Sequence, residues 1–195
     1  MCDSRSARIS TGPRASARRP ERTAAEPTAK PRSVSTPAAT IRILLAEQRL
    51  DLMRGGAVLR SYAVSTSKNG AGERSGSYQT PRGAHVVRAK IGAGAPLGAV
   101  FRGRRFTGEI YSEDLARAQP GRDWILTRIL WLSGLEVGRN RLGDVDTMRR
   151  YIYIHGTPDS ITLGIPGSHG CVRMANAAIV ELFDLVPAGT RVEIA

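Results

Sequence analysis

The sequence predicts one mainly β domain with a single clear helix near its C-terminus. Short apolar segments rich in β-branched and aromatic residues recur from residue 41 onward, separated by turns that contain Gly or Pro, which is typical of strands. One segment, MANAAIVELFDLV (174–186), instead spaces its apolar residues one and three apart, as an amphipathic helix does. At 195 residues the chain has room for one domain and a tail.

The first 40 residues are predicted to be a disordered basic tail or linker, which leaves 41–195 for the folded domain. Residues 1–40 contain a single Ile, a single Val and no aromatic residue, so they cannot bury enough apolar area to offset the entropy of ordering. Eight of them are basic and three are acidic. Because no aromatic residues for base stacking are interleaved with the arginines, we expect a solvated tail and no nucleic-acid partner.

The first ordered segments are predicted to form a hairpin of two strands. IRILLAEQRLDLM (41–53) and AVLRSYAVSTS (57–67) are joined by a Gly-containing turn. A Gly-rich loop (68–83) then leads to a strand, AHVVRAKIG (84–92). Residues 93–121 are irregular and rich in Gly and Arg, which indicates surface loops with short strands.

The second half of the domain is predicted to contain further strands and the helix. WILTRILWLSGL (124–135) has the β-branched and aromatic content of a buried strand, and RYIYIH (150–155) is a clearer strand. The helix over 174–186 ends where a Pro and a Gly follow it, and GTRVEIA (189–195) forms the last strand.

The charge balance favours an acidic partner. The chain carries 29 Lys and Arg against 17 Asp and Glu, a net charge of +12, so acidic polymers are electrostatically preferred to neutral or cationic ones. No apolar run approaches the roughly 18–20 residues that a membrane span needs. We also expect no secretory signal in this sequence, because residues 11–27 read TGPRASARRPERTAAEP where an apolar segment should stand.

The stretch GSHGCVRM (167–174) concentrates reactive side chains. Cys171 follows a Gly and precedes the predicted helix, where N–H groups and the helix dipole favour a thiolate, so we expect a lowered pKa and a nucleophile. The same N–H groups could stabilise an oxyanion. A thiol nucleophile needs a base, and two of the three histidines, His155 and His169, are near in sequence.

Structural interpretations of the same residues stay open. A lone cysteine is often a small buried hydrophobe, and a histidine at a strand end is often an ordinary polar residue. Zinc is a further alternative, in which His155, His169 and Cys171 would need Asp159 or His85 as a fourth ligand. A disulfide is not expected, because the two cysteines stand at opposite ends of the chain.

IHGT (154–157), followed by a Gly-containing loop and SHGCVRM, resembles the active-site signature of L,D-transpeptidase (YkuD-type) catalytic domains. The resemblance covers about 41–195, including TPRG and the terminal GTRVEI. It implies a β-sandwich-like catalytic domain with Cys171 as the nucleophile and His155 as its proton acceptor and donor. It further implies that Ser168, His169 and Gly170 shape the pocket and that the N–H of Cys171 or Gly170 helps to form an oxyanion hole. Arg173 would pair with a substrate carboxylate.

The resemblance also implies an activity. Such enzymes take an acyl group from a peptidoglycan stem peptide, release its terminal D-Ala and pass the thioester to an amine or to water. It implies no metal or organic cofactor, inhibition by carbapenems, and a place in the periplasm or cell envelope. Two alternatives are a cysteine hydrolase (carboxypeptidase or endopeptidase) acting on stems and a catalytically silent wall-binding module. The intact Cys171 and His155 argue against the silent module.

Overall fold

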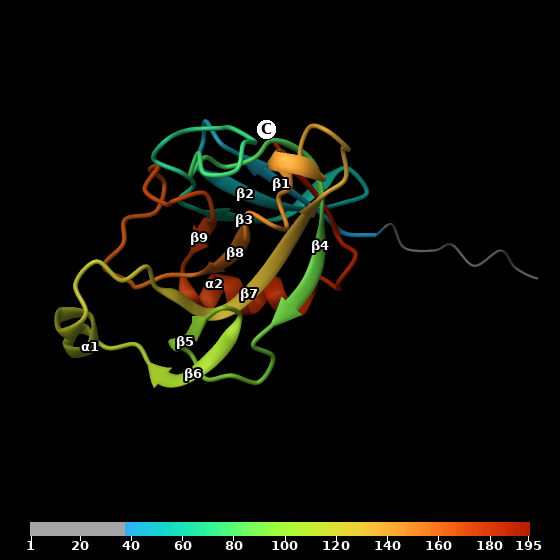
Figure 1. The fold of residues 1–195 in the computed structure, drawn as a ribbon. Helices are drawn as coiled ribbons and strands as arrows, with labels where there is room; N and C mark the ends of the chain where they lie inside the picture. The colour runs from blue at the N-terminus through green and yellow to red at the C-terminus, as the bar shows by residue number, and fades with distance from the viewer. Residues whose placement is uncertain (1–37) are drawn as a thin grey trace, which may run out of the picture. The chain divides into compact units, whose positions relative to one another are not determined.

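The computed structural model describes residues 38–195, which form a mainly β domain with a helix after the cysteine motif (Figure 1). The predicted fold class is therefore confirmed. The elements are β1 (Thr40–Leu44), β2 (Arg49–Arg54), β3 (Ala57–Ala63), β4 (Gly83–Ile91), β5 (Ala99–Arg102), β6 (Arg105–Ile110), α1 (Glu113–Ala118), β7 (Ile125–Gly134), a 3-10 turn (Gly143–Val145), β8 (Tyr153–Gly156), β9 (Val172–Met174), α2 (Asn176–Leu185) and β10 (Arg191–Ile194).

One mixed sheet holds all the strands, and β7 is its branch point. The order runs β3-β2-β1-β10-β4-β7, and from β7 it continues both to β5 and β6 and to β8 and β9. The β1–β10 and β8–β9 pairs are parallel, and the other pairs are antiparallel. β7 is the longest of these strands and is paired along both edges. Its sequence is rich in apolar residues because side chains on both faces are buried, Leu130 and Leu132 in the largest core and Leu126 and Ile129 in two smaller apolar clusters.

The far edge of β9 bridges back to the segment that follows β3. The Ser65 N–H donates to the Arg173 carbonyl at 3.0 Å, and the Arg173 N–H donates to the Ser65 carbonyl at 2.9 Å. The strands therefore wrap around the main core, which gives the domain its sandwich-like cross-section. This core draws on both ends of the described domain, and its fully buried members include Ile41, Ile43, Leu50, Leu130, Ile154, Val172, Met174 and Ile179.

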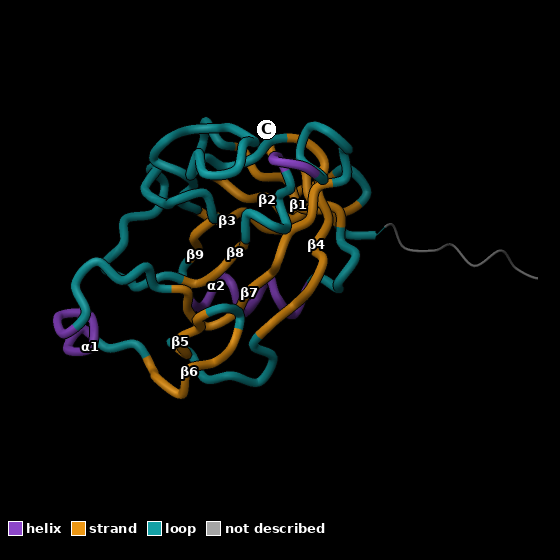
Figure 2. The backbone as a smooth tube through the Cα atoms, viewed as in Figure 1, coloured by secondary structure: helices purple, strands orange, loops and turns teal. Residues whose placement is uncertain are grey.

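Helix α2 packs against β7 and β8 (Figure 2). Its buried residues are Ile179, Leu182 and Phe183, which lie on one face as the spacing of apolar residues predicts. Lys90 of β4 covers the C-terminal end of the helix, where its ammonium donates to the carbonyls of Phe183 at 2.6 Å and Val186 at 2.8 Å. The predicted helix is confirmed, with its first residue at Asn176.

The prediction of a single strand over 41–53 is wrong. A turn over residues 45–48 divides this run into β1 and β2. Gln48 adopts a left-handed φ of 48°, and its amide donates to the Leu45 carbonyl at 2.6 Å and to Thr66 Oγ1 at 2.8 Å. The polar residues in the middle of the apolar run mark this turn.

One additional helix and two boundaries also differ from the sequence prediction. The irregular region 93–121 contains a helix, α1, besides the expected short strands, and Ser112 Oγ accepts from the N–H of Leu115 at its start. Residues 147–151 form a turn, so strand β8 begins only at Tyr153. Of the predicted tail over 1–40, residues 1–37 lie outside the described part, and Thr40 already begins β1. Within residues 38–195, no helix has the length and apolarity needed to cross a bilayer.

Candidate active site

The register of β8 and β9 gathers the predicted reactive side chains on one face. The two strands run parallel with His155 opposite Arg173. The alternate residues Ile154 and Val172 point into the main core. Because side chains alternate along a strand, the remaining residues of this segment share the opposite face. They are Tyr153, His155, Cys171 and Arg173.

Cys171 lies directly before β9, half-buried against an apolar cluster that includes Phe101 and Ile129. Its sulfur accepts from the Tyr153 N–H and donates to the Tyr151 carbonyl, both at 3.4 Å. Burial raises the pKa of Cys171 to about 12. The resting group is therefore a thiol.

The prediction that a helix N-terminus lowers the thiol pKa is wrong. Strand β9 (Val172–Met174) separates Cys171 from α2, which begins only at Asn176. The partial positive charge of a helix end falls off within the first turn, so it does not offset the burial of the sulfur.

His155 is buried, with 1% of its surface exposed, and its ring orientation is fixed. Nδ1 lies 2.8 Å from the Gly156 carbonyl oxygen, which can only accept, so Nδ1 carries the proton and Nε2 keeps its lone pair. Burial lowers the pKa of His155, so the imidazole is neutral at pH 7. The hydrogen bonds of the Cys171 sulfur within residues 38–195 go to backbone groups and to neither His155 nor His169.

Ser168 and Gly170 shape the turn that presents the thiol. The buried Ser168 hydroxyl donates to the Cys171 carbonyl at 2.5 Å and accepts from the Gly170 N–H at 3.1 Å. Gly170 has a φ of 121°, and a Cβ there would lie 3.1 Å from Ile152 and 3.3 Å from the Gln79 carbonyl. The Gly170 N–H is thus already used, whereas the Cys171 N–H has no acceptor among residues 38–195.

Arg173 and His169 converge on Asp123, which the sequence did not single out. Arg173 donates to Asp123 at 2.7 Å and to the Gly167 carbonyl at 3.1 Å. His169 is half-exposed, with Nδ1 at 3.8 Å from the other Asp123 oxygen and its ring edge-on to Tyr78. The pairing partner of Arg173 is therefore a carboxylate of the protein itself.

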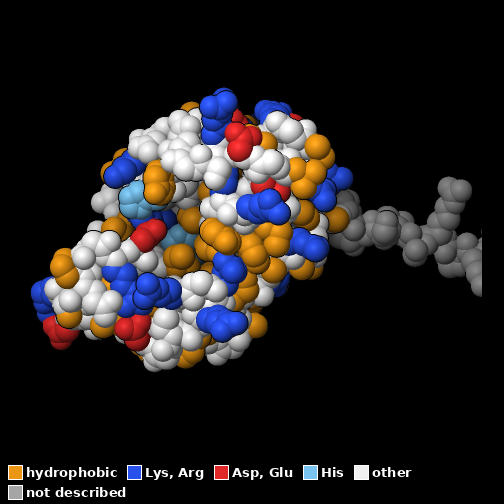
Figure 3. Space-filling view, in the orientation of Figure 1, with side chains coloured by type: hydrophobic (Ala, Val, Ile, Leu, Met, Phe, Trp, Pro, Cys, Tyr) orange, Lys and Arg blue, Asp and Glu red, His pale blue; other side chains and the backbone are white. Residues whose placement is uncertain are grey.

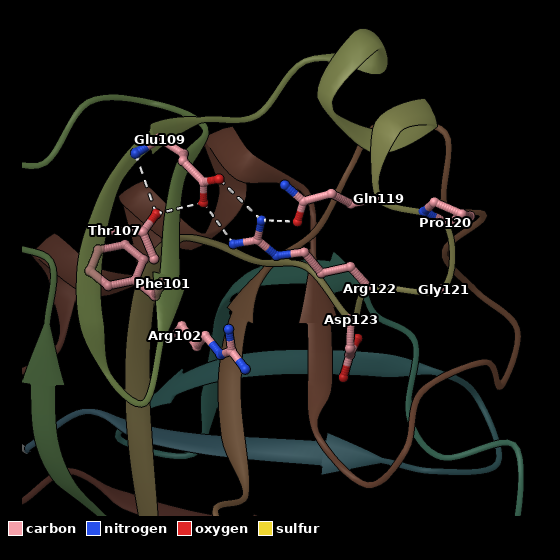
Figure 4. A pocket seen from close by; sticks show the side chains of 9 residues that line it. All are labelled: Phe101, Arg102, Thr107, Glu109, Gln119, Pro120, Gly121, Arg122 and Asp123. Atoms are coloured by element: carbon pink, nitrogen blue, oxygen red, sulfur yellow. Dashed lines mark hydrogen bonds and ion pairs between the residues drawn. The ribbon is translucent and has the colours of Figure 1, made fainter.

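A cavity of about 810 Å³ adjoins this cluster through Asp123. It lies between the β5–β6 hairpin and the segment after α1, and its polar wall includes the 2.7 Å ion pair between Glu109 and Arg122 (Figure 4). Histidine and acidic side chains lie beside a hollow on this side of the molecule, with Lys and Arg side chains next to it (Figure 3). The cavity wall also includes Phe101, which packs in the same apolar cluster as Cys171.

His85 belongs to a different part of the fold. It is buried on β4, with Nδ1 at 2.8 Å from the Gly83 carbonyl and Nε2 at 3.1 Å from Thr147 Oγ1. Within the described residues, no group of three or more His, Cys, Asp or Glu side chains is arranged to hold a metal ion. The described residues therefore provide no ligand set for the zinc site that the sequence left open.

The sheet order defines a mainly β domain, and its strands β8 and β9 carry a thiol and an imidazole on one face. The sequence model of the L,D-transpeptidase catalytic domain family (YkuD) matches residues 38–194, and the chain belongs to this family.

Individual relatives match over shorter segments. The probable L,D-transpeptidase YbiS of Escherichia coli K12 is 50% identical over 44 residues, which are 23% of this chain and 14% of the relative. The putative L,D-transpeptidase YkuD of Bacillus subtilis 168 is 44% identical over 46 residues, 24% of this chain and 28% of the relative. The matches thus span less than a third of these relatives.

A solved structure shows the same fold. The crystal structure of L,D-transpeptidase 3 from Mycobacterium tuberculosis superposes with a TM-score of 0.51 and 15% identity, covering 82% of this chain and 61% of that one.

Proposed function

We propose that this domain is an L,D-transpeptidase that acts on peptidoglycan stem peptides through a thioester on Cys171. One observation carries the proposal: in a domain of this family, Cys171 and His155 share one face of two paired strands. The His155 ring is oriented by its bond to the Gly156 carbonyl, which leaves Nε2 to handle a proton.

In the first step the Cys171 sulfur attacks the carbonyl that precedes the terminal D-Ala. An S–C bond forms, the C–N bond to D-Ala breaks, and the thiol proton passes through His155 Nε2 to the leaving amine. In the second step an acceptor amine attacks the thioester, a C–N bond forms, and the C–S bond breaks. The proton of the acceptor amine returns through His155 to the sulfur, and neither step needs a metal or an organic cofactor.

The resting protonation states suit this sequence. The raised thiol pKa and the lowered imidazole pKa together give a neutral thiol and a neutral base at pH 7. The sulfur gives up its bond to the Tyr151 carbonyl when its proton moves to His155 during attack. The Cys171 N–H, which has no acceptor among residues 38–195, is the donor we propose for the oxyanion.

We propose positioning roles for the remaining predicted residues. Ser168 and Gly170 hold the turn that presents the thiol. Arg173 and His169 place Asp123 at the edge of the cavity, where the substrate enters. Because stem peptides lie outside the cytoplasmic membrane, the proposed activity places the domain in the periplasm or cell envelope.

The same site is proposed to react with carbapenems. A nucleophilic thiol beside an oxyanion donor opens a strained β-lactam ring by the chemistry of the first step. L,D-transpeptidase 3 of M. tuberculosis has been crystallised with a faropenem-derived adduct. For this chain we expect a stable mass increase on Cys171 after incubation with a carbapenem.

The decisive experiment is intact-protein mass spectrometry after brief incubation with a disaccharide-tetrapeptide. The expected result is a mass gain equal to that of the disaccharide-tetrapeptide less D-Ala. This gain should be absent from Cys171→Ala and retained in Cys2→Ala, the matched control. Adding an amine acceptor separates transfer from hydrolysis, because the transferase yields the amide and a hydrolase only the free tripeptide stem. Absence of both adduct and released D-Ala, with wall binding unchanged in Cys171→Ala, would support the silent binding module.

A further inference from the structure

Two arginines near the thiol, Arg104 and Arg150, have no carboxylate partner among the described residues. The Arg150 guanidinium is already bonded to the backbone carbonyls of Gly72, Glu73 and Gln79. The guanidinium of Arg173 already holds Asp123 and the Gly167 carbonyl. Arg104, at the turn between β5 and β6, forms no ion pair within residues 38–195 and is half-buried. Of these three arginines, Arg104 has the most N–H groups free to bind an anionic group of a ligand.

Three aromatic residues hold the Arg104 guanidinium in place. Its Nη1 donates to the Tyr153 hydroxyl at 3.0 Å, and its Cζ lies 4.5 Å from the Trp131 ring centre and 5.0 Å from that of Tyr151. The backbone of Arg104 has a φ of 67°, a left-handed conformation that L-residues other than Asn and Asp rarely adopt. The turn thus directs the side chain onto the aromatic surface, where stacking restrains it.

The aromatic residues that hold this guanidinium also hold the thiol. The Cys171 sulfur bonds to the backbone of Tyr151 and Tyr153, whose rings contact Arg104. One tyrosine residue therefore links the two groups: the sulfur accepts from the Tyr153 N–H at 3.4 Å, and the guanidinium donates to the hydroxyl of the same residue at 3.0 Å. An extended peptide advances roughly 3.3–3.6 Å per residue, so a substrate bound at the sulfur can reach Arg104 within two or three residues.

We propose that Arg104 forms a carboxylate-binding site that recognises an acidic group of the acyl donor close to the carbonyl attacked by Cys171. A guanidinium has five N–H donors, and only one of those of Arg104 is used by the Tyr153 hydroxyl. The remaining N–H groups have no acceptor among the described residues, and they match the geometry of a planar carboxylate. This inference rests on the proposed function, because it assigns Arg104 to the substrate of that same site.

The alternative is that Arg104 only fastens the β5–β6 hairpin to the sheet. Two stems of identical length separate these roles: one with its non-terminal carboxylates free, and one with those groups converted to carboxamides. A purely structural arginine affects turnover of both stems alike, whereas a carboxylate-binding arginine affects only the acidic one. The amidated stem therefore also reports whether a variant retains its fold.

The experiment measures D-Ala release from both stems by the full chain and its variants. We expect the unaltered protein to prefer the acidic stem by about tenfold in kcat/KM, since hydrogen bonds to charged groups contribute more than neutral ones. Arg104→Gln should remove this preference by raising KM for the acidic stem, with little effect on the amidated one. Arg104→Lys should keep part of the preference, because it retains the charge without the planar fork. Arg105→Gln is the matched control. Arg105, the first residue of β6, is exposed, and its guanidinium forms no cation–π contact with these rings.

The outcomes separate the two proposals. Equal losses on both stems in Arg104→Gln, or no preference in the unaltered protein, would overturn the carboxylate site and leave the proposed activity standing. D-Ala release from neither stem by the unaltered protein would overturn both.

Discussion

At Cys171 the environment of a single side chain sets the chemistry. The sulfur is packed against apolar residues, and it donates to a backbone carbonyl, both of which favour the protonated form. The nearby imidazole of His155 is held neutral by its own burial. In the proposed mechanism, attack therefore depends on proton transfer to His155 and not on a thiolate that is present beforehand.

The raised thiol pKa predicts a specific pH dependence. In a Cys2→Ala background, the rate at which iodoacetamide alkylates Cys171 should still be rising at pH 9.5, because the pKa near 12 leaves thiolate formation incomplete there. Carbapenem acylation should instead rise with pH through the lowered pKa of His155, below its ordinary 6.5, and then stay level to pH 9. Stopped assays followed by intact mass measure both rates, and an alkylation rate that levels off below pH 8 would contradict the neutral pair.

The sequence identified the candidate catalytic residues but not their polar neighbours. Cys171 and His155 are predicted from their motif, and the structure places both on one face. Asp123 and Arg104 lie in the irregular region or beside it and carry no motif. Their partners stand 50 and 49 residues away in the chain, a separation that only folding closes.

Among the elements, the short strand β9 has the largest effect on the site. Its pairing with β8 sets Cys171 and His155 on one face, and its length moves the thiol away from the start of α2. Three residues form too short a run for a periodic pattern, so the sequence does not reveal this strand. Helix α1 had a readable signal, because Ser112 followed by two acidic residues is typical of a helix start.

The contact of Lys90 with the C-terminal end of α2 should stabilise the domain. Lys90→Met should lower the free energy of unfolding by about 1–3 kcal/mol, because the ammonium hydrogen-bonds two carbonyls at the negative end of the helix and stacks 4.3 Å from the Phe183 ring centre. Urea unfolding followed by circular dichroism measures this difference.

Arg88→Met on the same strand is the control for Lys90→Met. Arg88 is exposed, and its side chain forms no ion pair within the described residues, so its substitution should change stability by less than about 0.5 kcal/mol. Equal unfolding curves for Lys90→Met and the unaltered protein would show that α2 does not depend on this contact.

In the molecule as a whole, two buried neutral histidines link stability to pH. Burial lowers the pKa of both His85 and His155. Below about pH 6.5 the unfolded chain binds protons at these positions that the folded domain does not, so stability falls as the pH falls. The carboxyl groups with lowered pKa, such as Asp51 and Asp146, lose their contribution only at lower pH, as they become protonated.

The domain should therefore lose thermal stability before its carboxylates titrate. We expect Tm to fall between pH 6.5 and pH 5, with each histidine contributing up to about 1.4 kcal/mol per pH unit. Differential scanning fluorimetry across pH 5–8 measures this change, and His85→Gln should reduce the slope without touching the cysteine site. The same Tm at pH 7.5 and pH 5.5 would show that the two histidines are protonated in the folded state.

The sequence by itself determined the mainly β class, the late helix, the family resemblance and the pair Cys171 and His155. These properties are local, since strand and helix periodicity and an eight-residue motif can be read within short windows. Only the tertiary structure decided the protonation of the thiol, the pairing of Arg173 with Asp123 and the approach of Arg104 to the site. Burial and charge pairing depend on which distant segments come together, and the branching of the sheet at β7 brings these segments together.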